Sequence, residues 1–350
     1  MPIHKTLIAL LAGVACASAA QAQCLTDAQV ADLTTHYFAK TPAANIENLT
    51  DADGACTRAK FNAHIAPRLG KVVGYKAGLT NPAVQKRFGT DKPVWGTLYE
   101  GMVQPSGTTV EAAFGARPLF EADMLVRVKT AAIHTARSPL EVLEAVDQVI
   151  PFIELPDLLV QAPPKLNGAA VEAGFGARPL FEADMLVRVK SAQINQAKTP
   201  LQVLESIDQV IPFIELPDLL VQAPPKLNGA GVSAINVGAR LGVAGAPLAV
   251  PAYRAERYAF LQALADMQVS LTDGAGTRLG GGKGSDILEH PLNAVVWLAQ
   301  ALAQEGLAMQ PGDLISLGSF SPLLPPKAGL SVTATFEGLP GAEPVRVSFK

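Results

Sequence analysis

The sequence predicts an α+β fold with a helical N-terminal part and a duplicated strand–helix–strand unit. Three observations indicate this class. Segments near the N-terminus carry the capping residues and apolar spacing of amphipathic helices. A stretch of 61 residues is followed at once by a near-copy of itself, and each copy contains strand-like and helix-like runs. Short strand-like runs dominate the C-terminal part, so helices and strands do not alternate regularly as in a parallel α/β protein.

The composition narrows the classes of function. Of the 350 residues, 49% are hydrophobic and 17% are charged, and the formal net charge is −3. A disordered chain is excluded because it needs low hydrophobicity and a high net charge. The balance of 28 basic and 31 acidic residues provides no positive surface for nucleic acid. We therefore expect a globular protein whose partner is a small molecule rather than nucleic acid.

Residues 1–22 have the pattern of a secretory signal peptide. A basic start that includes Lys5 precedes an apolar run over residues 7–17, and Ala20-Gln21-Ala22 matches a signal-peptidase site. The apolar run is too short to span a bilayer. We expect an exported protein, periplasmic or secreted, with no membrane attachment after cleavage. The alternative is an N-terminal helix that belongs to the core.

Export would remove Cys16 and leave Cys24 and Cys56 as a pair. In an oxidising compartment we expect these two to form a disulfide that adds about 3 kcal/mol. The alternative is two unpaired thiols that act as small apolar side chains. Because the five histidines of the sequence are scattered and no other cysteine remains, any metal chemistry should use oxygen ligands.

We assign residues 23–109 to an N-terminal helical and strand segment. Thr26 and Gln29 form a capping box that opens a helix, and residues 58–69 have the pattern of a second helix. A short strand over residues 71–76 and a short helix over 81–88 follow. Residues 110–350 then form the second domain, which contains the repeat.

The repeat pairs residues 110–170 with residues 171–231, and 50 of the 61 positions are identical. Two units are too few for a solenoid, which indicates a partial duplication inside an ordinary domain. Each copy predicts a strand over 119–128 (180–189), a capped helix and a strand over 149–154 (210–215). Ser138 and Glu141 become Thr199 and Gln202 in the second copy, so the capping box is kept although both residues change. Both copies should therefore form the same unit.

After the repeat, the pattern predicts a strand near residues 235–243 and helices over 254–267 and 291–304. Strands dominate after residue 313. The glycine-rich run 280–284 fails as a phosphate-binding loop because Gly284 stands where Ser or Thr is required. We expect a mobile loop there.

Glu121 and Asp123 alternate along an apolar strand, so their carboxylates point to the same face. Two such carboxylates resist burial unless a cation neutralises them, and Glu154 could add a third oxygen ligand. An all-oxygen set suits Mg²⁺ or Mn²⁺. The alternative is a solvated sheet face. The second copy repeats the trio, as Glu182, Asp184 and Glu215. Lys76, at the end of an apolar strand, is either a surface charge or an acid–base group beside such a site.

Five motifs occur here in the order found in the 2-keto-4-pentenoate hydratases of the fumarylacetoacetate hydrolase superfamily. They are GYKAGLTNPAVQKRFGTDKPVWGTLYEGM, PLFEADMLVRV, VIPFIELPD, HPLNAVVWLAQAL and DLISLGSFSPLLP. The chain resembles this family over about residues 56–332, with one copy of the repeat set aside. The resemblance implies a mixed β-roll or sandwich fold for residues 110–350. It also implies metal-dependent addition of water to a 2-hydroxy-2,4-dienoate, and we expect a homo-oligomer.

The resemblance also assigns roles to residues. Lys76 and Asp91 would be catalytic, and Asn236 and Ser319 would contact the substrate. The metal ligands would be Glu182, Asp184 and Glu215, or the equivalent Glu121, Asp123 and Glu154, and a hybrid set drawn from both copies is a third option. We favour the second copy because it continues directly into the C-terminal half.

Three other functions stay open at this point. A related 2-oxo acid decarboxylase and a C–C bond hydrolase belong to the same superfamily. The hydrolases carry a His-x-x-Glu pair, which this sequence lacks after His36, His64, His134 and His290. An exported, non-catalytic protein that binds a metal or a carboxylate is the third.

Overall fold

The computed structural model describes residues 24–46, 49–116, 118, 120–155, 182–194, 204–205, 207–216 and 227–350. The expected signal peptide, residues 1–22, lies outside them. The helices are α1 Asp27–Ala39, α2 Asp51–Leu69, α3 Pro82–Arg87, α4 Pro139–Leu143, α6 Gly229–Ala234, α7 Arg254–Asp266 and α8 Leu292–Gln304, with short 3₁₀ turns η1 Glu100–Met102, η3 Asn236–Gly238 and η4 Gly284–Asp286. The strands are β1 Val72–Gly78, β2 Val94–Tyr99, β3 Val103–Pro105, β4 Thr109–Val110, β5 Glu121–Val128, β6 Val146–Leu155, β7 Glu182–Val189, β8 Ile207–Leu216, β9 Leu241–Ala244, β10 Leu248–Ala249, β11 Gln268–Asp273, β12 Arg278–Lys283, β13 Leu314–Ser316, β14 Ser331–Glu337 and β15 Val345–Phe349.

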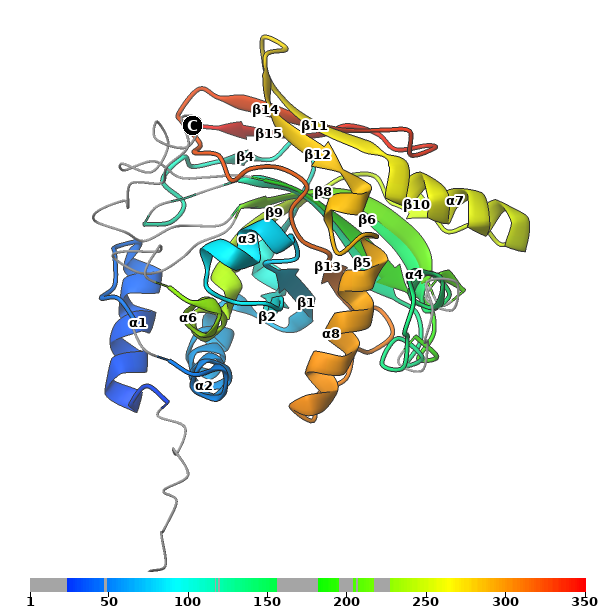
Figure 1. Ribbon diagram of the computed structural model, residues 1–350. Coiled ribbons are helices and arrows are strands. Elements are labelled where there is room, and N and C mark those ends of the chain that lie inside the picture. Colours follow the sequence, from blue (N-terminus) through cyan, green and yellow to red (C-terminus); the bar gives the residue numbers. More distant parts are fainter. Residues whose placement is uncertain are drawn as a thin grey trace, which may run out of the picture.

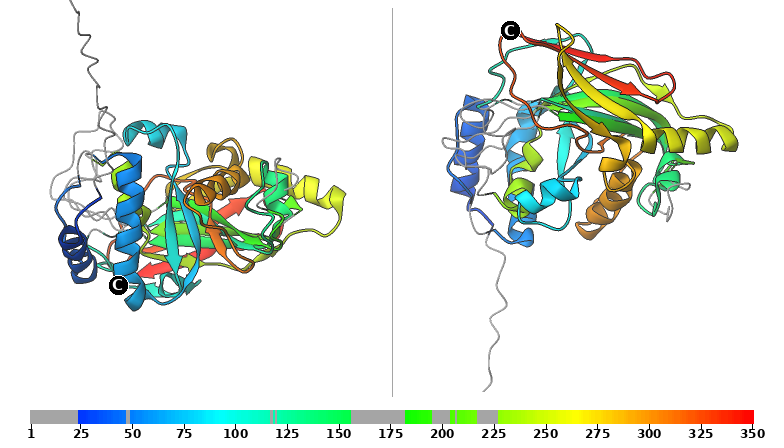
Figure 2. Two further views of the ribbon diagram at one scale, coloured as in Figure 1. Left: turned by 90° about the horizontal axis from the view of Figure 1, so that it is seen from below. Right: turned by 45° about the horizontal axis from the view of Figure 1, so that its top comes forward.

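Two sheets form the body of the molecule. Within the described residues, one sheet has ten strands in the order β2-β1-β13-β7-β5-β6-β10-β8-β9-β3, and the other has five in the order β12-β11-β14-β15-β4. The smaller sheet lies over one side of the larger sheet, and α2, α3, α6 and α8 lie on the other side (Figure 1). Figure 2 shows α1 and α2 at one end of the molecule and α7 at the opposite end. The predicted α+β class with an N-terminal helical part is confirmed, and the division between residues 109 and 110 stays a prediction.

The N-terminal helices begin at capping boxes. The Thr26 hydroxyl accepts from the Gln29 amide, and the Gln29 side chain accepts from the Thr26 amide, as predicted. The second helix begins at Asp51, earlier than the expected residue 58, because Thr50 and Asp53 form a second box of the same kind. Cys24 and Cys56 form a disulfide with a Cα–Cα distance of 5.6 Å, the pairing expected from the sequence.

Downstream of the repeat, the predicted helices over 254–267 and 291–304 are confirmed as α7 and α8. The predicted strand over 235–243 is partly wrong. Its first half forms η3, in which Asn236 and Val237 have φ values of 57° and 56°, and only the end of the segment pairs as β9. The glycine run expected to be a mobile loop is also wrong, because β12 pairs antiparallel with β11 through Gly280, Gly281 and Gly282.

The two copies of the repeat lie in the same sheet, in equivalent registers. β5 and β7 run parallel with Asp123 opposite Asp184, and β6 and β8 run parallel with Val149 opposite Val210. Both pairs are offset by the 61 residues of the repeat. Each copy also pairs its own two strands antiparallel. Both copies therefore form the predicted strands, whereas residues 195–203 of the second predicted helix lie outside the described part of the chain.

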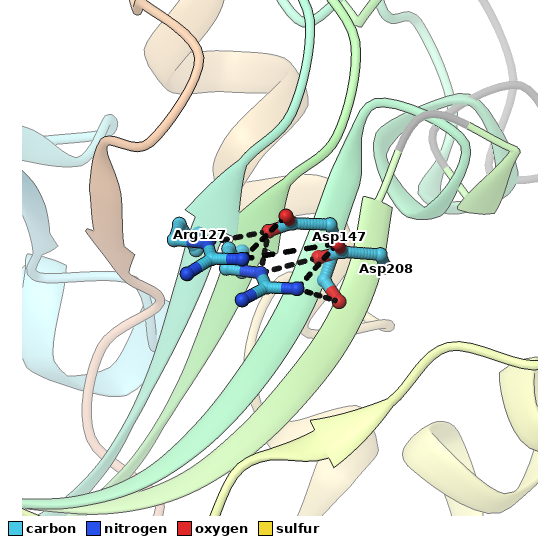
Figure 3. Close-up of polar contacts among 4 residues, drawn as sticks. Arg127, Asp147 and Asp208 are labelled. Atoms are coloured by element: carbon cyan, nitrogen blue, oxygen red, sulfur yellow. Dashed lines mark hydrogen bonds and ion pairs between the residues drawn. The ribbon is translucent and has the colours of Figure 1, made fainter.

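A cluster of four charges joins the copies (Figure 3). Arg127 Nε donates to Asp147 Oδ1 at 2.7 Å within the first copy, and Arg188 Nε donates to Asp208 Oδ1 at 2.6 Å within the second. Arg188 also forms an ion pair with Asp147, and Arg127 Nη2 lies 4.0 Å from Asp208 Oδ2. Each arginine thus has a complete partner inside its own copy.

Candidate active site

A buried lysine lies at the centre of the candidate site. Lys76 belongs to β1, which pairs with β2 on one side and with β13 on the other. Its side chain is 1% exposed, and its ammonium forms an ion pair and hydrogen bond with Glu154 Oε1 on β6. A charged amine is rarely buried this completely unless it has a partner. The interpretation of Lys76 as a surface charge is therefore wrong.

Two more carboxylates share the face of the sheet that carries Glu154. Glu121 pairs directly with Glu154 across β5 and β6, and Asp123 lies two residues along the same strand. Both Glu121 and Asp123 are fully buried, so the alternative of a solvated sheet face is excluded. The Ser316 hydroxyl, on β13, donates a hydrogen bond to Asp123 Oδ2. The prediction that alternate residues of this strand share one face is confirmed.

These side chains are unbalanced in charge. One ammonium faces three carboxylates, so full ionisation would leave two uncompensated negative charges in a buried region. Burial raises the pKa of Glu121 well above its usual range, and the neighbouring Asp123 raises it further, whereas Lys76 opposes the shift. Burial likewise raises the pKa of Asp123, against the hydrogen bond from Ser316 and the charge of Lys76. Both groups would gain from a cation nearby.

A cavity of about 280 Å³ opens onto this cluster. Lys76, Glu121 and Ser319 supply its polar atoms close to the sheet. Its apolar walls come from α3, α6, η3 and the segment after β13, through Val84, Phe88, Val232, Val237 and Leu323. Thr80, Asn81, Asp286 and Ser321 also line the cavity. It therefore combines charged and polar groups with apolar walls, which suits a small carboxylic acid with an apolar part.

The donor set fits a divalent cation in charge and in chemistry. Neither oxygen of Glu121 has a hydrogen bond of normal geometry to a described residue, and Glu154 Oε2 is also buried without one. A side-chain hydrogen bond from Ser319 and the charge of Lys76 only partly offset the burial of Glu121. Buried carboxylate oxygens and two excess negative charges match what Mg²⁺ or Mn²⁺ requires. Among the described residues, however, no group of three Asp, Glu, His or Cys side chains stands ready to hold a metal ion. The ammonium of Lys76 is the cation that contacts Glu154.

Two residues expected at the site lie elsewhere. Asp91 is exposed in the loop before β2 and lines a separate surface hollow with Asp51 and Asn228. Asn236 is fully buried, and its side chain pairs with the backbone of β2, where Oδ1 accepts from Thr97 N at 2.6 Å and Nδ2 donates to Thr97 O at 2.9 Å. Neither Asp91 nor Asn236 is among the described residues that line the cavity. The two hydrogen bonds to Thr97 indicate that Asn236 positions β2.

The second carboxylate trio is placed by its backbone. Glu182 and Asp184 lie on β7 and Glu215 on β8, and Glu182 pairs with Glu215 as Glu121 pairs with Glu154. The side chains of these three residues lie outside what the structure describes. The choice between the two sets of ligands stays a prediction.

The sequence reasoning missed Ser316. It lies in the DLISLGSFS stretch, on the same short strand that pairs with β1, and it contacts Asp123. Its signal was the alternation of Ser316 with apolar residues before Ser319, a pattern that is too common in strands to be read alone. Gly318 follows with φ of 103°, and a Cβ there would meet Thr80 Oγ1 at 2.1 Å, so the chain can turn toward the cavity only with glycine.

Three proteins similar in sequence to this chain are all named as hydratases. A 2-keto-4-pentenoate hydratase from Burkholderia vietnamiensis is 25% identical over 272 residues, which cover 77% of this chain and 76% of the relative. The chain is a relative of the 2-keto-4-pentenoate hydratases. A namesake from Paraburkholderia xenovorans is 24% identical and covers 74% of the chain and 70% of its own length. A 2-hydroxyhexa-2,4-dienoate hydratase from Comamonas testosteroni is 30% identical over 49% of the chain and 62% of its own length. These names agree with the hydratase activity that the sequence resemblance implies.

The fold matches solved structures of the same type. A 4-oxalocrotonate decarboxylase from Pseudomonas putida G7, complexed with magnesium and adipate, superposes with a TM-score of 0.62 at 20% identity. The match covers 94% of this chain and all of that one. The chain thus shares the fold of that decarboxylase, which agrees with the expected mixed sheet fold. No protein-family model matches the chain. None of the helices in the described ranges has the length and apolar character needed to cross a membrane.

Proposed function

We propose that this chain is a metal-dependent hydratase that adds water to a 2-hydroxy-2,4-dienoate and yields a 4-hydroxy-2-oxo acid. The observation that carries the proposal is the buried Lys76 among Glu121, Asp123 and Glu154, beside a cavity that combines polar groups with apolar walls. The names of the relatives support the same reaction.

Lys76 is the residue we assign to proton transfer. Its ammonium lines the cavity while it contacts Glu154, so it can donate a proton to a substrate atom and recover one through that carboxylate. Water addition to the dienoate forms a C–O bond at the distal double bond and requires protons on carbon, and a positioned acid–base group provides them. Asp91, which the resemblance named as a second catalytic group, does not line the cavity in this structure.

The remaining lining residues bind and shield the substrate. The half-buried Ser319 hydroxyl lines the cavity and donates to Ser321 O at 2.7 Å, so it can accept a hydrogen bond from a substrate hydroxyl, or donate to a substrate oxygen after it rotates. Phe88, Val232 and Val237 belong to the apolar walls, where the diene tail would lie. Apolar walls limit the access of bulk water, which strengthens the electrostatic interactions with the charged groups.

We further propose that Glu121, Asp123 and Glu154, or the equivalent Glu182, Asp184 and Glu215, hold Mg²⁺ or Mn²⁺. Carboxylate oxygens are the ligands these two ions prefer. When bound, such an ion supplies Lewis-acid polarisation of substrate oxygens. Relatives of this fold have been solved with magnesium and with calcium, which supports a divalent ion.

The test is the loss of dienoate absorbance when the purified protein meets 2-hydroxypenta-2,4-dienoate, with Mg²⁺, with Mn²⁺ and with a chelator. We expect turnover that the chelator abolishes and that added metal restores. Turnover unchanged by the chelator would contradict the metal assignment. An inactive protein that still binds Mn²⁺ in calorimetry would refute the substrate and leave the metal site standing.

We propose export for the whole chain, supported by the Cys24–Cys56 disulfide. Cell fractionation tests it, and we expect the protein in the periplasm or medium with residues 1–22 removed. A reduced protein in the cytosolic fraction would contradict the proposal. The homo-oligomer expected from the resemblance stays a prediction, which light scattering of the purified protein can check.

A further inference from the structure

The strands next to the repeat, β9 and β10, pair with both copies through the same residues. Ala244 of β9 pairs with Phe152 of the first copy and with Phe213 of the second, and Leu248 of β10 pairs with both Val149 and Val210. The equivalent residues are 61 positions apart in each case. The register of the neighbouring strands therefore does not distinguish one copy from the other.

Single hydrogen-bonding groups are shared in the same way. The Leu317 amide, after β13, donates to Met124 O at 3.2 Å and to Met185 O at 2.8 Å, which are equivalent carbonyls of the two copies. The Ala145 carbonyl accepts from Thr130 N at 3.1 Å and from the equivalent Ser191 N at 2.8 Å. One amide hydrogen forms one strong hydrogen bond, so the Leu317 amide cannot serve both copies fully at once.

β6 and β8 compete for one edge of β9. A strand has two edges, and β3 already occupies one edge of β9 through the pairing of Val103 with Gly242. Both β6 and β8 pair with the remaining edge, where Glu154 and Glu215 each lie opposite Gly242. Neighbouring strands need a separation of about 4.8 Å, so one edge has room for one partner.

The structure places both copies against these edges at once, with Val149 opposite Val210, although one edge admits one strand. We therefore propose that the two copies are alternative occupants of one position in the large sheet, and that the protein exchanges between them. Either copy then presents its carboxylate residues at equivalent backbone positions of the sheet, Glu121, Asp123 and Glu154 in one state and Glu182, Asp184 and Glu215 in the other. β5 and β7 have identical sequences, and β6 differs from β8 only by Val146 in place of Ile207. Nearly equal strands on identical neighbours give two states of similar population.

The charge cluster fits this exchange. Arg127 and Asp147 satisfy each other within the first copy, and Arg188 and Asp208 do so within the second. A copy that enters or leaves the sheet therefore carries its own ion pair and leaves no unpaired charge behind.

Cysteine competition tests the proposal without any need for turnover. In a Cys16→Ser background, Leu248→Cys is combined with Val149→Cys and Val210→Cys, so that one thiol faces two equivalent partners. Residues directly opposite in an antiparallel pair are close enough for a disulfide. Trypsin cleaves after Arg137 and Lys198, and the two resulting peptides differ in mass because residues 138–148 differ from 199–209. Mass spectrometry therefore identifies each bridge.

We expect both the 248–149 and the 248–210 bridge, each in a substantial share of the molecules. The double variants Leu248→Cys/Val149→Cys and Leu248→Cys/Val210→Cys serve as standards for the two products. A single product would overturn the proposal, because it would mean that one copy holds the position permanently. A dominant 149–210 bridge would also overturn it, because both copies would then lie in the sheet together.

A stability measurement keeps the proposal falsifiable if the cysteine variant does not fold. Met124 and Met185 are equivalent and fully buried. If the copies alternate, Met124→Ala or Met185→Ala alone removes one of two states and changes the unfolding equilibrium constant by about two-fold. The double variant should change it by at least about 30-fold, as expected for a truncated core methionine. Effects that simply add in the double variant would overturn the proposal.

Discussion

The positive charge of Lys76 balances the negative charge of one of three buried carboxylates. The remaining negative charge is the reason for the proposed metal ion. Removing the charge of Lys76 leaves Glu154 buried without its partner. Breaking a buried ion pair in this way lowers the free energy of unfolding by about 3–5 kcal/mol. The same ammonium is the described cation that lines the cavity. Stability and the proposed proton transfer would therefore depend on one side chain, and they must be separated by experiment.

We predict that Lys76→Met lowers kcat by about 10²- to 10⁴-fold, because a positioned acid–base group is lost. The loss of dienoate absorbance measures it. Lys76→Met/Glu154→Gln removes both charges and should recover stability but not turnover. Lys92→Met, at an exposed lysine paired with Asp51, is the matched control and should leave kcat unchanged. Full activity in Lys76→Met would refute the assignment.

His290 gives the molecule a pH dependence that is independent of the site. Its Nδ1 accepts a hydrogen bond from Leu292 N at 3.1 Å, and its Nε2 bonds to Leu261 O at 3.1 Å, so the ring is held neutral. Burial lowers its pKa from 6.5 to about 4. The unfolded chain therefore binds a proton first as the pH falls, and stability is lost between about pH 6.5 and pH 4.

We predict that this window costs on the order of 2 kcal/mol of unfolding free energy, after a discount for partial exposure. Urea unfolding at a series of pH values measures it. Burial also lowers the pKa of His134 to about 3, so His134 contributes a slope of the same sign. His290→Gln should therefore reduce the slope between pH 6.5 and 4, whereas His64→Gln, at an exposed position on α2, should not. An unchanged slope in His290→Gln would contradict the prediction.

At the scale of single residues, strand alternation and an apolar context are local signals, and the structure brings Glu121, Asp123 and Glu154 together with Lys76. Their roles at the site stay a prediction. The sequence could not place Asp91 or Asn236. Whether a loop residue faces a cavity depends on contacts with distant elements, such as the bond from Asn236 to Thr97 on β2. Ser316 was missed for the same reason, since its partner Asp123 lies far away in the sequence.

At the scale of elements, the N-terminal part is held by a covalent bond between the start of α1 and the first turns of α2. The bond between Cys24 and Cys56 closes a loop with a sequence separation of 32 residues. A loop of this length restricts the unfolded chain by about 3–4 kcal/mol in the chain-entropy account. Charged side chains also anchor α1. Lys60 forms an exposed ion pair with Asp27, and the buried Arg240 donates to Tyr37 O at 2.7 Å and lies 3.8 Å from the centroid of the Tyr37 ring.

We predict that Cys24→Ser/Cys56→Ser loses about 3 kcal/mol of unfolding free energy. Urea unfolding of the variant and of the reduced native protein should give the same value. Lys60→Met removes the exposed ion pair instead and should cost less than about 1 kcal/mol. A native protein whose stability is insensitive to reductant would contradict the prediction.

Elements with strong local signals were predictable, and those fixed by their neighbours were not. The capping box at Thr26 and the apolar stripes of α7 and α8 placed helices correctly. The glycine run of β12 has no side chains to show a pattern, yet pairing with β11 makes it a strand. The start of α2 was misplaced because Asp53 takes the place of the usual Glu or Gln in the box.

At the scale of the whole molecule, the repeat is the feature that no general rule of folding anticipates. The sequence showed that both copies could form strands, and both do. It could not show that they converge on the same edges of β9 and β10, because that depends on the assembled sheet. The long-range register is a property of the whole fold.

We predict that deleting residues 110–170 and deleting residues 171–231 give two proteins that fold cooperatively. Their unfolding free energies should agree within about 1 kcal/mol, since the strands differ by one methylene, Val146 against Ile207. Urea unfolding with two optical probes measures both. One deletion that folds beside another that does not would contradict the prediction.

The shared register also bears on the history of the gene. Two long stretches that are nearly identical invite recombination, which would remove one of them in a single event. Because the flanking strands accept either stretch in the same alignment, such a loss returns a chain with a complete sheet and a complete set of carboxylates. Until it happens, selection protects the function while either copy remains intact, and the other is free to accumulate changes. The 11 differences between the copies are the changes accumulated so far.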